Sequence, residues 1–198
     1  KRVAVVGPPH SGKSVFLGGL CSNLPRKNYF LFRACPDGEG SWTWRSESSF
    51  KYRRKGEFTP KIVSWYVNSL KGATSLAPLV LVDLGGRRSP ENTKILKEGG
   101  VRYGIILSHS HTELKLWKEY LHSLSITVIA EIISDYNGTE DRTSGSVLSV
   151  HHLERGDESV SERPTIKETA IRLLNLISAG DEPNNKCIPG CSEERRTQ

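Results

Sequence analysis

The sequence predicts an α/β fold, with a mostly parallel sheet covered by helices on both faces, and three observations lead to this prediction. Short apolar runs alternate along the chain with segments whose apolar residues recur at helical spacing. One run, Leu79–Val82, is apolar at every position, which is typical of a central strand covered on both faces. Strands that alternate with helices at this rhythm are joined by right-handed crossovers, and such connections leave the strands parallel.

Three strands and three helices are expected in the first half of the chain. The β-branched run at residues 3–6 ends at Gly7 and two prolines, the pattern of a buried strand that closes in a turn. Thr59-Pro60 and Ser89-Pro90 each begin a helix, because proline fits the first helical position and the residue before it can cap free amides. The expected strands are residues 3–6, 29–34 and 79–82, and the expected helices are residues 13–24, 60–71 and 90–98.

The second half is expected to continue the alternation with three more strands and two helices. Ser110 and Glu113 have the spacing of a capping box that opens a helix, and Thr165 with Glu168 repeats that spacing before the last amphipathic stretch. Residues 135–146 are rich in Gly, Asn, Asp, Ser and Thr, which predicts a loop. The expected strands are residues 103–107, 126–133 and 147–150.

Length and composition predict one domain at residues 1–178, followed by a disordered polar tail at residues 179–198. No apolar run approaches the roughly eighteen residues that cross a bilayer, so a soluble, cytoplasmic protein without membrane association is expected. The chain has no methionine, even at position 1, which suggests a piece of a longer protein. Its 28 Lys and Arg against 22 Asp and Glu leave a net charge of +6, a mild excess that favours phosphate-bearing partners.

Residues 7–14, Gly-Pro-Pro-His-Ser-Gly-Lys-Ser, match the phosphate-binding pattern Gly-x-x-x-x-Gly-Lys-Ser between a predicted strand and a predicted helix. In that context backbone amides and the helix dipole converge on an anion. Gly7 opens the loop, and the two prolines lack amide hydrogens, so the cradle is expected from His10, Ser11, Gly12, Lys13, Ser14 and Val15. We expect Lys13 to contact the β- and γ-phosphates and the Ser14 hydroxyl to ligate Mg²⁺. The alternative is a glycine turn with an incidental lysine.

Asp83 ends an apolar strand and is expected to be the magnesium-associated acid of the same site; the alternative is an acid that caps the next turn. Residues 83–86 also fit Asp-x-x-Gly, in which the Gly86 amide could meet a γ-phosphate. Leu84 stands where ring-forming and transport ATPases have a water-activating glutamate, which favours the kinase and GTPase branch. No Asn-Lys-x-Asp pattern for guanine is present, so ATP is favoured over GTP, and a GTPase-like switch stays an alternative.

Two pairs of charged residues could take part in phosphoryl transfer. Asp37 and Glu39 follow the second predicted strand, where a carboxylate could act as the catalytic base of a kinase; the alternative is a glycine turn with solvated acids. Arg87 and Arg88 come directly after the Asp-x-x-Gly pattern and could stabilise charge on a transferred phosphoryl group. Surface arginines exposed to water are the alternative.

Residues 42–58 interleave aromatic side chains with basic ones, among them Arg45, Arg53 and Arg54. This mixture suits the stacking of bases and the pairing of phosphates, so the segment could be a lid or a surface for an oligonucleotide. The alternative is a packed insertion whose aromatic residues belong to the core.

Four segments of the chain resemble the P-loop NTPase domain found fused to CRISPR-associated ring nucleases of the cyclic-oligoadenylate pathway. They are GPPHSGKSVFL at residues 7–17, RACPDGEG at 33–40, LVLVDLGG at 79–86 and SPEN at 89–92. The resemblance implies a P-loop NTPase fold, nucleotide binding at residues 7–14 with Asp83 as the acidic partner, a role in antiviral defence and a fused nuclease domain in the parent chain. It implies no ring-nuclease activity for these 198 residues themselves.

Three functional hypotheses follow from the residues and the resemblance. The first is an Mg-ATP-dependent enzyme, either a kinase-like phosphotransferase or an ATPase. The second is a nucleotide-binding regulatory module with little turnover that controls a fused or partner nuclease. The third is binding of cyclic oligoadenylate or RNA through residues 42–58. A homo-oligomer is compatible with each of them.

Overall fold

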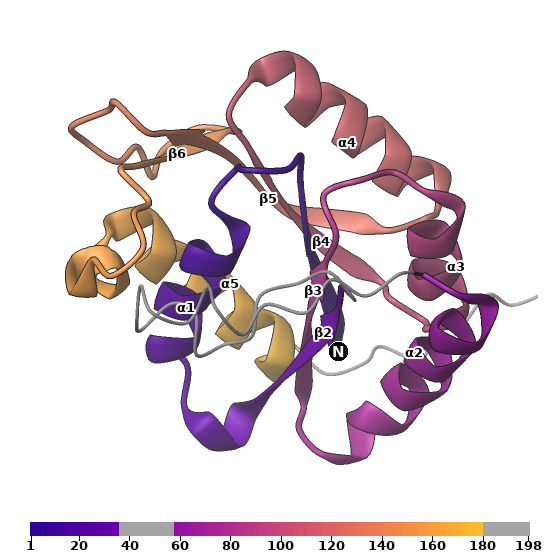
Figure 1. The fold of residues 1–198 in the computed structure, drawn as a ribbon. Coiled ribbons are helices and arrows are strands. Elements are labelled where there is room, and N and C mark those ends of the chain that lie inside the picture. Colours follow the sequence, from indigo (N-terminus) through magenta and orange to yellow (C-terminus); the bar gives the residue numbers. More distant parts are fainter. Residues whose placement is uncertain (36–57, 180–198) are drawn as a thin grey trace, which may run out of the picture.

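The computed structural model describes residues 1–35 and 58–179, and these residues form a six-stranded sheet with helices on both faces (Figure 1). The strand order is β2-β3-β1-β4-β5-β6, and neighbouring strands are parallel throughout this sheet. The predicted α/β class is therefore confirmed. The strands are β1 (Arg2–Val6), β2 (Tyr29–Ala34), β3 (Leu79–Leu84), β4 (Tyr103–Ser108), β5 (Thr127–Asp135) and β6 (Leu148–His151).

Helices on the two faces enclose two hydrophobic cores, because successive side chains of a strand point to opposite faces of the sheet. Val3 and Val5 of β1 pack in the core beneath α1 and α5, whereas Ala4 and Val6 pack in the core beneath α2, α3 and α4 (Figure 1). All six residues of β3 are buried, which explains its continuous apolar run. The helices are α1 (Lys13–Ser22), α2 (Pro60–Gly72), α3 (Pro90–Glu98), α4 (His111–Ser123) and α5 (Pro164–Ser178).

Three helices begin where the sequence predicts, each with a hydroxyl that accepts a hydrogen bond from a first-turn amide. Thr59 Oγ1 caps α2, Ser89 Oγ caps α3 and Ser110 Oγ caps α4, at oxygen–nitrogen distances of 3.3, 3.3 and 3.2 Å. Such caps contribute about 1 kcal/mol each, because they satisfy amides that have no partner inside the helix.

The capping prediction for Thr165 is wrong. Helix α5 begins at Pro164, so Thr165 lies inside the first turn, and Arg163 at the N-cap position makes no side-chain capping bond. The Thr165 amide instead donates to Asp141 Oδ2 at 2.9 Å, and the Thr165 hydroxyl donates to the carbonyl oxygen of Ser149 at 2.6 Å. The amide at this helix start is satisfied by a carboxylate distant in sequence, which a local spacing rule does not detect.

The carboxyl ends of three parallel strands meet at one edge of the sheet. Val5 of β1 is in register with Asp83 of β3, and Val6 is in register with Ile106 of β4. The loops that follow these strands therefore lie side by side, and ligands of open α/β sheets bind at this kind of edge.

In residues 1–35 and 58–179, no helix has the length and apolar character needed to cross a bilayer. Most of the predicted insertion at 42–58 and nearly all of the predicted tail at 179–198 fall outside the described residues. Asp37, Glu39, Arg45, Arg53 and Arg54 also lie outside them. The single-domain assignment and the roles of these residues remain predictions.

Candidate phosphate-binding site

The loop between β1 and α1 has a tightly wound backbone that requires glycine at two positions. Gly7 has a φ of 148° and Gly12 has a φ of 80°, both in the region that favours glycine. A Cβ atom at Gly7 would lie 1.8 Å from the carbonyl oxygen of Leu107, and one at Gly12 would lie 2.8 Å from Leu153 Cδ1. His10 also has a positive φ, 62°, a conformation that costs free energy for a residue with a side chain. The two pattern glycines are thus explained by close packing of the loop between β4 and the segment after β6.

The Lys13 side chain lies within this loop. Its ammonium group donates to the carbonyl oxygens of Gly7 at 3.0 Å and Pro8 at 2.7 Å. The Ser11 hydroxyl donates to the same Pro8 oxygen at 3.0 Å. Burial lowers the pKa of Lys13, and the nearby Asp83 carboxylate opposes that shift. The loop therefore holds the Lys13 ammonium group against main-chain carbonyl oxygens. A phosphate oxygen could replace one of these carbonyl oxygens as the hydrogen-bond acceptor of Lys13.

Asp83 is buried, with 7% of its surface exposed, next to the phosphate-binding loop. Burial raises the pKa of Asp83, while Arg33 and Lys13 oppose the shift, and Arg33 Nη1 lies 3.9 Å from Asp83 Oδ2. The two cations thus compensate only part of the cost of burying the charged carboxylate. An additional cation beside Asp83 would favour its ionised form.

The turn after β3 packs directly against the phosphate-binding loop. A Cβ atom on Gly86 would lie 2.6 Å from the backbone nitrogen of Pro9 and 3.0 Å from the carbonyl carbon of Pro8. The buried Asn92 amide holds this turn by donating to the carbonyl oxygens of Gly85 at 3.3 Å and Arg87 at 2.7 Å. The predicted contact of the Gly86 amide with a γ-phosphate remains a prediction, but this close approach of the two backbones supports it.

Replacing Gly86 with alanine is expected to weaken MgATP binding, because the new methyl group must displace the Pro8-Pro9 backbone. We expect a loss of at least about tenfold, which is the effect of losing one charge-assisted hydrogen bond. Titration calorimetry measures the change. Gly72→Ala at the end of α2 is the matched control, since a Cβ atom there has no neighbour within 4 Å. Equal affinities of the two variants would show that this contact does not shape the site.

Two adjoining cavities form a groove in front of the loop. The first, of about 260 Å³, is lined by residues 10–15 together with Leu153 and Arg155. The second, of about 410 Å³, shares Val15 and Arg155 with the first and continues along α1 past Gly18 and Gly19. Its other wall is the segment after β6, which contributes the acidic residues Glu154, Asp157 and Glu158. The groove therefore has residues 10–15 of the loop at one end and three carboxylates at the other, and Arg155 lines both cavities.

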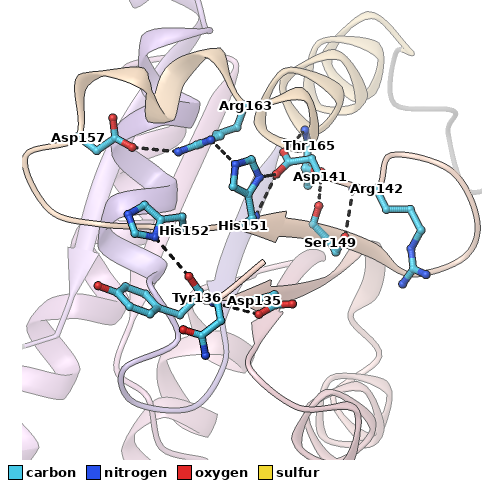
Figure 2. Close-up of polar contacts among 11 residues, drawn as sticks. Asp135, Tyr136, Asp141, Arg142, Ser149, His151, His152, Asp157, Arg163 and Thr165 are labelled. Carbon is cyan, nitrogen blue, oxygen red and sulfur yellow. Dashed lines mark hydrogen bonds and ion pairs between the residues drawn. The ribbon is translucent and has the colours of Figure 1, made fainter. Parts of the chain in front are cut away.

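A partly buried cluster of hydrogen-bonded side chains fixes both ends of the segment that forms this wall (Figure 2). Asp141, whose side chain is fully buried, accepts hydrogen bonds at Oδ1 from the backbone amide and Nδ1 of His151, at 3.0 and 2.6 Å. Arg163 donates to the other ring nitrogen of His151 and to Asp157 Oδ2, the latter at 3.0 Å. Because arginine can only donate, Nδ1 of His151 carries the ring proton. We call Asp141, His151, Asp157, Arg163 and Thr165 the His151 cluster.

The His151 cluster cannot be recognised from the sequence. Its members come from the loop after β5, the end of β6, the segment that follows β6 and the start of α5, so no spacing rule connects them. The only local signals are a histidine at a strand end and an aspartate in a polar loop, and both are common at surfaces. Tyr136 and His152, whose ring centroids are 5.2 Å apart, lie beside the cluster (Figure 2).

Arg87 and Arg88 lie next to the phosphate-binding loop but differ in their contacts. Arg88 Nη1 lies 3.1 Å from Glu113 Oε2, and its guanidinium carbon lies 5.4 Å from the centroid of the Trp117 ring. Arg87 is exposed, and its carbonyl oxygen accepts from Asn92. Stabilisation of a transferred phosphoryl group by either arginine stays a prediction.

The donor set around the loop fits a magnesium–nucleotide complex. Phosphates require a wound loop with amides that face a cavity, and residues 10–15 line such a cavity. A hard divalent cation requires oxygen ligands, and the buried Asp83 carboxylate, whose charge is only partly compensated, offers one. Within the described ranges, no cluster of three or more His, Cys, Asp or Glu residues could hold a metal ion by itself. A magnesium ion at Ser14 and Asp83 would therefore need phosphate or water oxygens to complete its coordination.

No family model matches the chain, and no curated protein sequence matches it. Among solved structures, it is similar to the septum site-determining protein MinD from Pyrococcus horikoshii, complexed with Mg-ADP, with a TM-score of 0.53, 11% identity and coverage of 71% of this chain and 72% of that chain. An ADP-bound nucleotide-binding protein from Archaeoglobus fulgidus has a TM-score of 0.43, 13% identity and coverage of 67% and 65%. A sugar kinase from Janibacter sp. has a TM-score of 0.36, 14% identity and coverage of 88% and 94%.

The likeness to MinD is one of fold, since the identity is only 11%, and the two lower scores add no argument. Together with the parallel sheet and the Gly-x-x-x-x-Gly-Lys-Ser loop between β1 and α1, it shows that this chain has the α/β fold of P-loop NTPases.

Proposed function

We propose that this chain binds MgATP at residues 7–15 and acts as a kinase-like phosphotransferase or ATPase. One arrangement carries the proposal: a glycine-requiring loop that holds Lys13, with the buried carboxylate of Asp83 on the neighbouring strand. Amides 10–15 would bind the terminal phosphates, and Lys13 would leave the two loop carbonyls for the β- and γ-phosphate oxygens. Ser14 and Asp83 would hold Mg²⁺, which supplies charge neutralisation for the phosphates when bound.

The groove along α1 suits the nucleoside half of the same ligand. It begins at Val15, directly after the residues expected to bind phosphate, and continues to the wall that carries Glu154, Asp157 and Glu158. Asp157 is paired with Arg163 and Glu154 with His152, but a carboxylate can accept several hydrogen bonds, so this wall still complements ribose hydroxyls and an exocyclic amino group. ATP is preferred over GTP because the chain lacks an Asn-Lys-x-Asp pattern.

Lys13→Ala is expected to weaken MgATP binding by about tenfold to a hundredfold, because a charged hydrogen bond contributes about 1.5–3 kcal/mol. Titration calorimetry with MgATP measures the change. Lys61→Ala removes the same charge from an exposed position in the first turn of α2 and is expected to leave the affinity unchanged. An unchanged affinity in the Lys13 variant would overturn the proposed function.

A second candidate is a regulatory module that binds nucleotide with little turnover. Leu84 stands where some ATPases carry a water-activating glutamate, which argues against fast hydrolysis and is compatible with such a module as well as with a kinase. Incubation with γ-labelled ATP and Mg²⁺, with and without nucleotide acceptors, separates the possibilities. Free labelled phosphate indicates an ATPase, a labelled acceptor indicates a phosphotransferase, and binding without either product supports the regulatory module.

We further propose that the domain acts alongside a CRISPR-associated ring nuclease, as a fused or partner module in antiviral defence. The support is the sequence resemblance at residues 7–17, 33–40, 79–86 and 89–92. The proposal predicts that MgATP changes the rate at which such a nuclease cleaves cyclic oligoadenylate when this domain is present. A cleavage rate independent of MgATP and of Lys13 would contradict it.

A further inference from the structure

A third cavity lies on the other side of the phosphate-binding loop from the groove. Its volume is about 510 Å³, and Pro8 and Pro9 form the wall that it shares with the loop. The groove borders α1, on one face of the sheet, whereas this cavity borders α4, which covers the opposite face (Figure 1). Its remaining walls are the turn with Gly86, Arg87 and Arg88, His109 between β4 and α4, and Glu113 and Trp117 of α4. We call it the α4-side cavity.

Basic side chains outnumber acidic ones around the α4-side cavity. Arg87, Arg88 and His109 line it, against the single carboxylate of Glu113. Within residues 1–35 and 58–179, neither the Arg87 side chain nor the His109 side chain has a hydrogen-bond or ion-pair partner, and both residues are exposed. The cavity therefore contains donor groups that are available to an anion.

Arg88 is held in position for such a ligand. Glu113 Oε2 accepts from its Nη1 at 3.1 Å, and its guanidinium carbon lies 5.4 Å from the centroid of the buried Trp117 ring. A guanidinium has five N–H donors, and the carboxylate uses only part of them. Holding the side chain in place in advance reduces the entropy that is lost when a ligand binds.

The turn that carries Arg87 is also fixed. Asn92, only 1% exposed, donates from its side-chain amide to the carbonyl oxygens of Gly85 and Arg87. The Gly86 backbone is pressed against Pro8 and Pro9, so the turn cannot move toward the phosphate-binding loop. The positions of both arginines are therefore defined by packing and hydrogen bonds within the protein.

We propose that the α4-side cavity is a second ligand site, which binds a small phosphate-bearing molecule at the same time as the nucleotide. Arginine side chains match the oxygens of a phosphate group, and Arg87, Arg88 and His109 approach the cavity from two separate elements. The volume exceeds what inorganic phosphate needs and leaves space for an organic group. The proposal rests on the proposed function, since the second ligand would lie across the phosphate-binding loop from the nucleoside.

Titration calorimetry with inorganic phosphate and with glucose 6-phosphate tests the proposal, at constant ionic strength and with the protein saturated by the magnesium complex of a non-hydrolysable ATP analogue. The analogue occupies residues 10–15 together with the β- and γ-phosphate positions, so any remaining phosphate binding reports another site. We expect Arg87→Ala to weaken that binding at least about tenfold and His109→Gln to weaken it less. Lys115→Ala, which removes a positive charge from α4 outside the cavity lining, is expected to leave it unchanged.

The outcomes separate this proposal from the function proposed above. Absence of phosphate binding to the protein saturated with the ATP analogue, or binding that Arg87→Ala and Lys115→Ala reduce equally, would overturn the second site and leave MgATP binding intact. If Lys13→Ala fails to change MgATP affinity while Arg87→Ala still reduces phosphate binding, the second site stands and the nucleotide site falls. Arg87 and His109 are exposed, so neither variant is expected to unfold the protein.

Discussion

Replacing Asp141 with alanine is expected to lower the free energy of unfolding by about 3 kcal/mol or more. The Asp141 side chain is fully buried and accepts hydrogen bonds from the amide and ring of His151 and from the amide of Thr165. Each buried donor that loses its acceptor costs about 1–3 kcal/mol. Urea denaturation measures the change as a lower midpoint with an unchanged slope.

Glu140→Ala is the control for this variant, because it removes a neighbouring exposed carboxylate and is expected to shift stability by no more than about 0.5 kcal/mol. The Asp141 variant is also expected to bind MgATP less tightly, since the His151 cluster anchors the wall that places Leu153 against Gly12. A loss below about 1 kcal/mol in the Asp141 variant would mean that water or other groups satisfy these donors, and that the cluster has no large structural role.

Asp83→Asn is expected to change stability and binding in opposite directions. Burial raises the pKa of Asp83, so the folded apoprotein binds this proton more tightly than the unfolded chain does. Above the pKa that Asp83 has in the folded protein, its ionisation therefore lowers the free energy of unfolding. This loss disappears as the pH falls below about 3.8, the ordinary value for aspartate, because the group is then protonated in both the folded and the unfolded state. The neutral variant is expected to unfold at a higher temperature than the wild type at neutral pH, and this advantage is expected to vanish in acid.

The same substitution is expected to weaken MgATP binding by about tenfold to a hundredfold, through loss of a charged group at the proposed magnesium position. Thermal unfolding in EDTA at several pH values and titration calorimetry with MgATP measure the two effects. Asp135→Asn changes an exposed aspartate and is expected to alter neither quantity strongly. A less stable apoprotein at neutral pH would show that Asp83 stabilises the fold through Arg33 and Lys13 more than its burial destabilises it.

The phosphate-binding loop could be predicted from sequence because its residues are contiguous. Gly7, Gly12 and Lys13 act through the backbone of one turn, so their spacing alone carries the geometry. The position of Asp83 beside this loop could be predicted because it follows four apolar residues of β3, and parallel neighbours bring their carboxyl ends to one edge. Its role as a magnesium ligand stays a prediction. The same kind of local pattern predicts a capping role for Thr165, and that prediction is wrong because Thr165 lies inside the first turn of α5 and Asp141 satisfies its amide.

The sequence by itself determined the order of strands and helices, the α/β class and the position of the phosphate-binding loop, because these depend on local periodicity, capping residues and one contiguous motif. Only the tertiary structure decided that Asp141, His151 and Arg163 form one partly buried, hydrogen-bonded cluster, and that Arg87 and His109 line one cavity beside Trp117. Such groups assemble when loops from different strands fold against each other. Hydrogen bonds and charges between residues distant in the chain leave no periodic signal in the order of the amino acids.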